Sequence, residues 1–240
     1  MKVLGIIPAR GNSKGLPKKN ILKLNNEPLI RHSITSAKKS TFLDKIIVST
    51  DNLQIAKIAK DSGIDVPFIR PKILSQDSTE ILDVIKHAIN FLDKNNNFMP
   101  DIVVLLQPTS PFRTTEMIDN AIKILKTTLS SSVVSVSLVK DHPDISFWHN
   151  QKYLKPFNSD FTKFSNRQTQ KPLYSPTGGI YAFRTENLIK YNSIYGPKIK
   201  PMFIDDKFIN LDIDELYDLF ICEMTIKHWK NYKHSFKKSQ

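Results

Sequence analysis

A loop near the start of the chain combines cations and glycines in a pattern suited to phosphate. The segment PARGNSKGLPKKN follows the apolar run Val3–Ile7 and places Arg10, Lys14, Lys18 and Lys19 beside two glycines. Glycines let backbone N–H groups approach phosphate oxygens, and fixed cations neutralise charge that develops during transfer of a phosphoryl-type group. The spacing fits neither G-x-x-x-x-G-K-[ST] nor G-x-G-x-x-G. The pattern therefore predicts a triphosphate-binding loop outside those two classes.

Two aspartates near the other end of the chain have the chemistry of a metal site. Asp212 and Asp214 are separated by one residue in the segment LDID. A hard cation such as Mg²⁺ is often held by one or two carboxylates, with waters and substrate phosphates as its other ligands. Asp212 with Glu215 also fits a capping box at the start of a helix, so both interpretations stay open. For Asp77 with Glu80, where the same choice arises, we favour capping.

The composition limits the class of protein. With 240 residues and 40% hydrophobic content, the chain can form one large α/β domain with a sizeable core. The net charge of +12 raises the question of nucleic acid. We expect no nucleic-acid partner, because part of the charge lies in the loop Arg10–Lys19 and no nucleic-acid module is present. Much of the rest lies in a basic tail that contains Lys227, Lys230, Lys233, Lys237 and Lys238.

Cysteine, histidine and apolar content exclude several further classes. The single cysteine, Cys222, permits neither an intramolecular disulfide nor a cysteine-based zinc cluster, and we expect it to be a buried thiol on a helix. The histidines lack the spacing of metal ligands. The run Val3–Ile7 is too short for a signal peptide, and no stretch approaches the roughly 20 apolar residues of a membrane helix. We expect a cytoplasmic protein that does not associate with membranes.

Apolar patterns predict the elements that position these residues. Short strands and amphipathic helices alternate, which is typical of a doubly wound, mostly parallel α/β sheet with ligands beyond the carboxyl ends of its strands. Strands are expected at Val3–Ile7, Lys45–Ser49, Val66–Ile69, Asp101–Gln107, Val133–Val139 and Gly179–Phe183, with a short element near Met202–Ile204. Helices are expected after Leu29, after an N-cap at Asp51, over Thr79–Asp93 and Glu116–Lys126, and from Asp212 to about Trp229.

Two loops and one irregular stretch complete the organisation. The loops Pro8–Asn20 and Pro108–Arg113 follow predicted strands, so they should meet at one edge of the sheet and form a site. The stretch of residues 141–176 is polar, rich in aromatic side chains and without clean periodicity. A long irregular segment inside a compact domain indicates a functional or interface insertion. We expect a small insertion with its own hairpin.

Two motifs carry a resemblance to a known family. The segments IIPARGNSKGLPKKNI and LLQPTSPFR resemble the two signature motifs of the acylneuraminate cytidylyltransferases, which include the CMP-sialic acid and CMP-legionaminic acid synthetases. The resemblance covers nearly the whole chain up to the last helix. Weaker matches follow in the order of the family: IIVSTDN, RPKILSQDST, NRQ, GGIYAF and LDID.

The resemblance implies an activity and a set of site residues. Family members are Rossmann-like nucleotidyltransferases that transfer CMP from CTP to the anomeric hydroxyl of a nine-carbon 2-keto sugar acid with Mg²⁺, and Mn²⁺ is the alternative cation. Arg10, Lys19 and Asp212 would be catalytic, and Asp212 with Asp214 would hold the metal. The implied substrate contacts are Arg10, Ser13, Lys14, Lys19 and Asn20 for CTP, Arg70, Asp77 and Ser78 for base and ribose, and Gln107, Arg167, Gln168 and Tyr181 around the sugar acid.

Departures from the family pattern keep the acceptor open. Asp144 and Ile145 follow the His-Pro of the insertion where sialate enzymes have a basic residue, and Thr177 replaces an asparagine before Gly178. A legionaminic-type acid is therefore as good a candidate for the acceptor as N-acetylneuraminic acid. Pseudaminic acid and 3-deoxy-octulosonic acid are the alternative acceptors. The alternative function is that of a non-catalytic nucleotide-binding protein on the same fold. The resemblance also implies one nucleotidyltransferase domain over residues 1–240 and a homodimer formed through the insertion.

Overall fold

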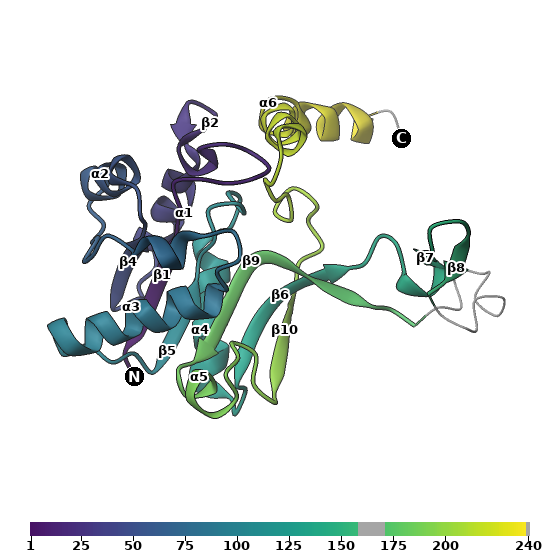
Figure 1. Cartoon of the computed structure of the whole chain (residues 1–240). Coiled ribbons are helices and arrows are strands. Elements are labelled where there is room, and N and C mark those ends of the chain that lie inside the picture. Colours follow the sequence, from purple (N-terminus) through teal and green to yellow (C-terminus); the bar gives the residue numbers. More distant parts are fainter. Residues whose placement is uncertain (158–170, 239–240) are drawn as a thin grey trace.

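The computed structural model describes residues 1–157 and 171–238, which form an α/β fold around a six-stranded sheet (Figure 1). All neighbouring strands are parallel except β9, which runs antiparallel to both β5 and β6. The prediction of a mostly parallel α/β sheet is confirmed. The strand order is β10 (Ile199–Phe203), β6 (Ser132–Leu138), β9 (Tyr174–Arg184), β5 (Ile102–Leu105), β1 (Val3–Pro8) and β4 (Lys45–Ser49).

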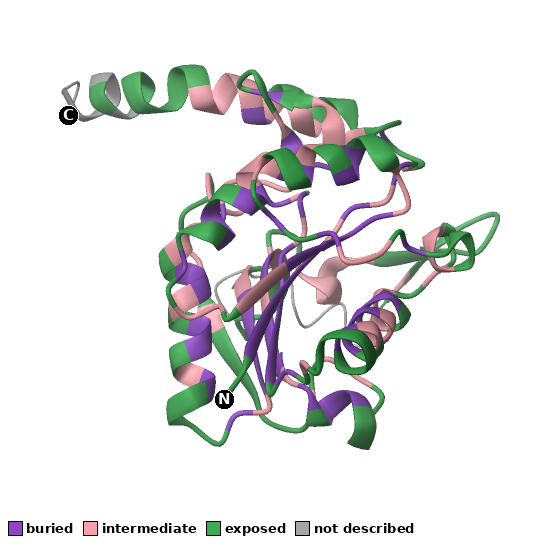
Figure 2. Cartoon of the chain, turned by 90° about the vertical axis from the view of Figure 1, so that its left-hand side faces the viewer, coloured by how far each residue is buried: buried purple, intermediate pink, exposed green. Residues whose placement is uncertain are grey.

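Helices cover both faces of this sheet, because alternate residues of each strand point to opposite sides. On one face, Ile7 packs in a cluster with α1 (Leu29–Lys38), α2 (Leu53–Asp61) and α4 (Thr115–Thr127). On the other face, Ile6 packs in a second cluster with α3 (Ile81–Asn96). Figure 2 shows the central strands as the buried layer between the helices. The sheet is therefore doubly wound, as the alternation of elements predicts.

Two local predictions around β4 are wrong. The segment Val66–Ile69 is not a regular strand, because this part of the chain makes only isolated parallel bridges along β4 and the residue after it, at Ile47↔Asp65 and Thr50↔Ile69. The N-cap of α2 is Asn52 rather than Asp51, since the Asn52 side chain accepts hydrogen bonds from the amides of Gln54 and Ile55. Asp51 is thereby left to bind the nearby basic loop.

The last helix begins later and runs further than predicted. α6 spans Leu216–Lys238, and Asp218 caps its start by accepting hydrogen bonds from the amides of Asp214 and Glu215, both 2.9 Å long. The capping-box interpretation of Asp212 is therefore wrong. The basic end of the chain is helical up to Lys238 and extends beyond the body of the fold (Figure 2). Cys222 is buried on this helix, as expected.

An arm carries the irregular stretch away from the sheet. The outer ends of β6 and β9 continue together beyond the core and lead to a hairpin of β7 (Phe147–His149) and β8 (Leu154–Pro156), preceded by the short helix η3 (Pro143–Ile145) (Figure 1). The insertion thus has the expected hairpin. Arg167 and Gln168 lie outside the described residues. In the described part of the chain, no helix is long and apolar enough to cross a membrane.

Candidate active site

A cavity of about 830 Å³ lies beyond the carboxyl ends of β1 and β5, where the sheet topology places ligands. Among the predicted site residues that the structure describes, only Ser78 does not line it. Ser78 is exposed, although its neighbours Asp77 and Thr79 line the cavity. The predicted residues in the lining are Arg10, Ser13, Lys14, Lys19, Asn20, Arg70, Asp77, Gln107, Tyr181, Asp212 and Asp214.

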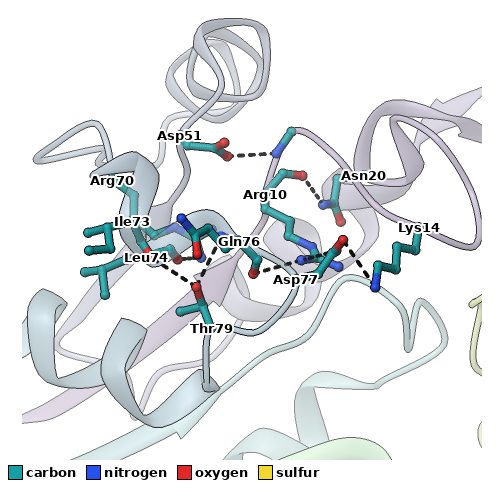
Figure 3. Close-up of polar contacts among 11 residues, drawn as sticks. Arg10, Lys14, Asn20, Asp51, Arg70, Ile73, Leu74, Gln76, Asp77 and Thr79 are labelled. Atoms are coloured by element: carbon teal, nitrogen blue, oxygen red, sulfur yellow. Dashed lines mark hydrogen bonds and ion pairs between the residues drawn. The ribbon is translucent and has the colours of Figure 1, made fainter.

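Hydrogen bonds fix the basic loop at both ends. The amide of Gly11 donates to Asp51 over 2.8 Å, and the side-chain amide of Asn20 donates to the carbonyl of Arg10 over 2.9 Å (Figure 3). In the middle of the loop, a Cβ on Gly15 would lie 2.7 Å from the carbonyl oxygen of Asp214. Only glycine fits there, so the loop and the segment before α6 are packed against each other. The two sequence motifs therefore form one wall of the cavity.

Carboxylates pair the cations of this loop. The Arg10 guanidinium lies 2.9 Å from one Asp77 oxygen, and the Lys14 ammonium lies 3.7 Å from the other (Figure 3). Lys19 contacts Asp214 at 2.8 Å. Asp77 does not cap α3, because Glu80 occupies the N-cap position without a side-chain hydrogen bond. The favoured capping role of Asp77 is therefore wrong, and its carboxylate instead pairs with Arg10.

Arg70 fixes the second wall of the cavity. Its buried guanidinium donates to the carbonyls of Ser49 and Leu74, at 2.9 and 3.3 Å, and burial lowers its pKa. The hydroxyl of Thr79 bridges the same turn, since it accepts from the amide of Gln76 over 3.1 Å (Figure 3). Thr79, which ends the Asp77–Thr79 turn that the resemblance assigns to base and ribose, lines the cavity. Gln76 also lines it but was missed as a site residue, and its only signal was its place inside the RPKILSQDST motif.

The aspartate pair lies beside the loop cations, since Lys19 contacts Asp214. Asp212 accepts a hydrogen bond from the Ser110 hydroxyl over 2.9 Å. Burial raises the pKa of Asp212, and nearby Asp214 adds to that rise, whereas hydrogen bonds from Thr109 and Ser110 and the charge of Lys19 oppose it. The described residues contain no group of three histidine, cysteine or acidic side chains placed for a metal. A pair of carboxylates beside a phosphate site suits Mg²⁺, whose remaining ligands would be phosphates and water.

The end of the cavity near β9 is polar and uncharged. Gln107 follows β5, and Tyr181 has its pKa raised by burial, with Tyr195 and Asp212 contributing. Gly178 has a φ of +75°, and a Cβ there would lie 2.8 Å from the Ser110 hydroxyl oxygen. Further hydroxyl and amide groups in this lining come from Ser137, Ser175, Thr177 and Asn210. Ser137, Ser175 and Asn210 were missed, because serine and asparagine in an irregular stretch give no periodic or charge signal.

Comparison with known proteins assigns the fold and the motifs to one family. Residues 4–221 match the family model described as Cytidylyltransferase. The chain belongs to this cytidylyltransferase family. It is 35% identical over 226 residues to the CMP-N,N'-diacetyllegionaminic acid synthase of Legionella pneumophila, a match that covers 93% of this chain and 95% of that protein. The resemblance seen in the sequence motifs is thereby confirmed.

Two further comparisons extend this assignment. The chain is 34% identical to the N-acylneuraminate cytidylyltransferase of Escherichia coli over 96% of its own length and 53% of that protein. Among solved structures, CMP:2-keto-3-deoxy-manno-octonic acid synthetase complexed with CTP has a TM-score of 0.70 at 14% identity and covers 95% of this chain and 99% of that one. The second comparison shows that the cytidylyltransferase fold is shared.

Proposed function

We propose that this cytidylyltransferase transfers CMP from CTP to the anomeric hydroxyl of a nonulosonic acid and releases pyrophosphate. One observation carries the proposal: a single cavity joins the loop cations Arg10, Lys14 and Lys19 to the pair Asp212 and Asp214 and to a polar, uncharged end. The first group suits a triphosphate, and the uncharged end suits a hydroxylated sugar. The name of the 35% identical Legionella protein, which matches almost end to end, supports the same acceptor class.

The cations would bind CTP by exchanging partners. Phosphate oxygens would replace the Asp77 carboxylate beside Arg10 and Lys14, whose ion pairs with Asp77 measure 2.9 and 3.7 Å. Lys19, with only 11% of its side chain exposed, is held in place at the cavity by its ion pair with Asp214. The acceptor oxygen would attack the α-phosphorus in line, forming a new P–O bond as the bond to the β-phosphate breaks. Arg10 and Lys19 would neutralise the charge that develops on the phosphoryl oxygens.

Asp212 and Asp214 fit a divalent cation. Burial raises the pKa of Asp212, so a cation bound beside its ionised carboxylate would offset the cost of that burial. Both carboxylates line the cavity beside the phosphate-binding cations. A bound Mg²⁺ would supply further neutralisation of the triphosphate, and Mn²⁺ accepts the same oxygen ligands. Asp212 and Asp214 would hold the metal, and Lys19, which now contacts Asp214, would contact the phosphates instead.

The uncharged end of the cavity would bind the acceptor. Gln107, Thr177 and Tyr181 can form hydrogen bonds with sugar hydroxyl and acyl groups, which are both donors and acceptors. Arg167, outside the described residues, remains our candidate for the acceptor carboxylate, because a guanidinium binds a carboxylate with two parallel hydrogen bonds. We place diacetylated legionaminic acid first among acceptors, since that compound appears in the name of the Legionella relative.

We further propose that the chain forms a homodimer through its arm. The β7–β8 hairpin exposes the large apolar side chains of Trp148, Leu154 and Phe157, with relative exposures of 60%, 64% and 50%. Apolar side chains gathered on a projecting element indicate a protein contact surface. The sheet core does not need this hairpin for its own packing, so a second copy of the chain is the partner that fits.

Turnover tests the proposal. Purified protein with CTP and Mg²⁺ should release pyrophosphate when given diacetyllegionaminic or N-acetylneuraminic acid. Pseudaminic acid and 3-deoxy-octulosonic acid serve as alternative acceptors, and the one with the highest kcat/KM identifies the substrate. Release with none of the four acids would contradict the proposal. Calorimetric CTP binding that persists without turnover and is insensitive to Asp212→Ala would instead identify a nucleotide-binding protein.

A further inference from the structure

Arg113 is a buried arginine that lies behind the wall of the active-site cavity. Its residue is 3% exposed and does not line that cavity. The hydrogen bonds of its guanidinium all end on neutral oxygens: the carbonyl of Gly179, the hydroxyl of Ser33 and the carbonyl of Gln107. The distances to Ser33 and Gln107 are 3.0 and 2.6 Å. One planar group therefore connects α1, the loop after β5, and β9.

The two carbonyls that Arg113 binds lie where the sheet pairing is interrupted. The last paired residues of β5 and β9 are Leu105 and Tyr181, so Gln107 lies beyond this ladder. The pairing of β6 with β9 shifts register between Val134 and Val136, which leaves the region of Gly179 irregular. Buried backbone carbonyls need a donor, and the ladder supplies none here. The carbonyl of Gln107 also accepts from the Ser110 amide and the Ser33 hydroxyl, both over 3.3 Å, so the donor from Arg113 matters most for Gly179. The rigid fork of a guanidinium serves both carbonyls and fixes the distance between them.

This connection sets the shape of the acceptor end of the cavity. Gln107 and Gly178 both line the cavity. A Cβ built on Gly178 would lie 3.5 Å from a carboxylate oxygen of Asp212 and 3.8 Å from the side-chain oxygen of Gln107. A shift of either backbone segment would therefore move groups that face the acceptor.

We propose that Arg113 is a positioning residue that holds the ends of β5 and β9 in the arrangement that binds the acceptor, without touching either substrate. The proposal rests on the proposed function, because it assigns Gln107 and the Gly178 turn to the acceptor. Burial lowers the pKa of Arg113 to about 9, with the charge of Asp212 opposing, so the side chain stays protonated at neutral pH. A buried charge whose hydrogen bonds all go to neutral oxygens is costly for stability, which favours a role in site geometry.

The chain offers a matched control on the same strand. Arg184, at the opposite end of β9, also donates to backbone carbonyls: to Ser130 over 3.0 Å, to Leu125 over 2.6 Å and to Thr128 over 3.0 Å. These hydrogen bonds connect β9 to α4 and to the loop that follows α4, and Arg184 does not line the cavity. Loss of Arg184 should weaken the fold in the same manner as loss of Arg113. Only Arg113 should affect the acceptor.

The test compares Arg113→Lys, Arg184→Lys and Ser33→Ala at a temperature where all three are folded. We expect Arg113→Lys to lower kcat/KM for the acceptor by about tenfold to a hundredfold, because small misplacements at a site have effects of that size. Calorimetric CTP affinity should change by no more than about twofold. Ser33→Ala, which keeps the arginine, should have a smaller effect of the same kind. Equal kinetic effects of Arg113→Lys and Arg184→Lys would overturn the proposal.

Hydrogen exchange separates this proposal from the proposed function. Arg113→Lys should accelerate amide exchange in residues 178–181 while leaving the far end of β9 as in wild type, and Arg184→Lys should show the reverse. If wild-type protein fails to turn over any acid, the proposed function fails, and the exchange pattern alone decides whether Arg113 positions this segment. Unchanged exchange at residues 178–181 would then overturn the proposal.

Discussion

The cations proposed to bind phosphate are each paired with a carboxylate. Arg10 and Lys14 share Asp77, and Lys19 contacts Asp214. These carboxylates hold the cations at one end of the cavity. In the proposed binding of CTP, phosphate oxygens replace the carboxylates, so the loss of the ion pairs offsets part of the attraction between the cations and the triphosphate.

Lys19 is the cation whose loss should be most visible in the rate. Lys19→Met removes an ammonium proposed to lie at the α-phosphate, and removal of one transition-state donor lowers kcat by about 10²-fold or more. The measurement is steady-state turnover with saturating CTP and acceptor. The control Lys23→Met removes an exposed lysine of β2 (Lys23–Leu24) and should leave kcat unchanged. Equal rates for Lys19→Met and wild type would rule out this role for Lys19.

The raised pKa of Asp212 predicts that the stability of the protein depends on pH. Burial raises the pKa of the Asp212 carboxyl group, so the folded state binds a proton more tightly than the unfolded chain does. Its contribution to stability is therefore present at low pH and is lost as pH rises through the raised pKa. Asp212→Asn should be more stable than wild type in metal-free buffer at neutral pH, and the difference should disappear below the ordinary carboxylate pKa.

Thermal unfolding across pH checks this prediction, with Asp93→Asn on the exposed face of α3 as the control. The control should follow the wild-type profile at every pH. A stability difference between Asp212→Asn and wild type that grows as pH falls would contradict the stated sign. Turnover of Asp212→Asn should be lost in parallel, because the proposed metal ligand is removed.

At the scale of elements, β9 is the strand that shapes the site. It lies between β6 and β5 and runs antiparallel to both. Its irregular region contains Gly178, which has a φ of +75°. Gly63 has a nearly equal φ of +73°, but a Cβ there would meet only the flexible end of Lys38 at 3.0 Å. Both glycines therefore need the left-handed backbone region, but only Gly178 is surrounded by residues of the cavity.

Gly178→Ala and Gly63→Ala should therefore differ in activity more than in backbone strain. Both variants place an L side chain in the left-handed region, which costs about 1–2 kcal/mol. Gly178→Ala also forces Ser110 away from Asp212, so we expect it to be the less stable variant and to lose about tenfold or more in kcat/KM. Denaturant unfolding and kinetics check both parts. Wild-type kinetics for Gly178→Ala would contradict the structural account of this turn.

Periodicity predicted the elements better than it predicted the contacts between them. Apolar spacing placed β1, β5 and α3 correctly, because these elements bury one face or both. The capping roles predicted for Asp51 and Asp77 were wrong because both side chains bind the basic loop. Each of these contacts joins residues 40 or more positions apart in the sequence, which no local pattern encodes. Cavity residues such as Gln76 and Asn210 were missed for the same reason, since only the tertiary fold brings them to the site.

At the scale of the whole molecule, the chain divides between a sheet core that binds nucleotide and an arm that extends away from it (Figure 1). The arm begins where β6 and β9 leave the sheet, and the same segment of β9 lines the acceptor end of the cavity. A partner bound to the arm would therefore be connected to the site through one continuous strand. Assembly and acceptor binding are expected to influence each other.

Trp148→Asp tests the assembly. A charge in place of an exposed aromatic side chain on the hairpin should convert the proposed dimer into a monomer in sedimentation velocity, because an unpaired buried charge disfavours association. Leu129→Asp, which changes a side chain 84% exposed in the loop after α4, is the control and should leave the sedimentation coefficient unchanged. A wild-type protein that sediments as a monomer at all accessible concentrations would remove the basis of the dimer proposal.

Phosphorus NMR of the complete reaction tests the central claim most directly. CTP, Mg²⁺ and diacetyllegionaminic acid are mixed with the enzyme, and the phosphorus signals are followed in time. Attack at the α-phosphate predicts that the triphosphate signals are replaced by one phosphodiester signal and by pyrophosphate in equal molar amounts. Formation of a diphosphate-linked sugar with inorganic phosphate, or unchanged CTP in the presence of every nonulosonic acid, would contradict the account.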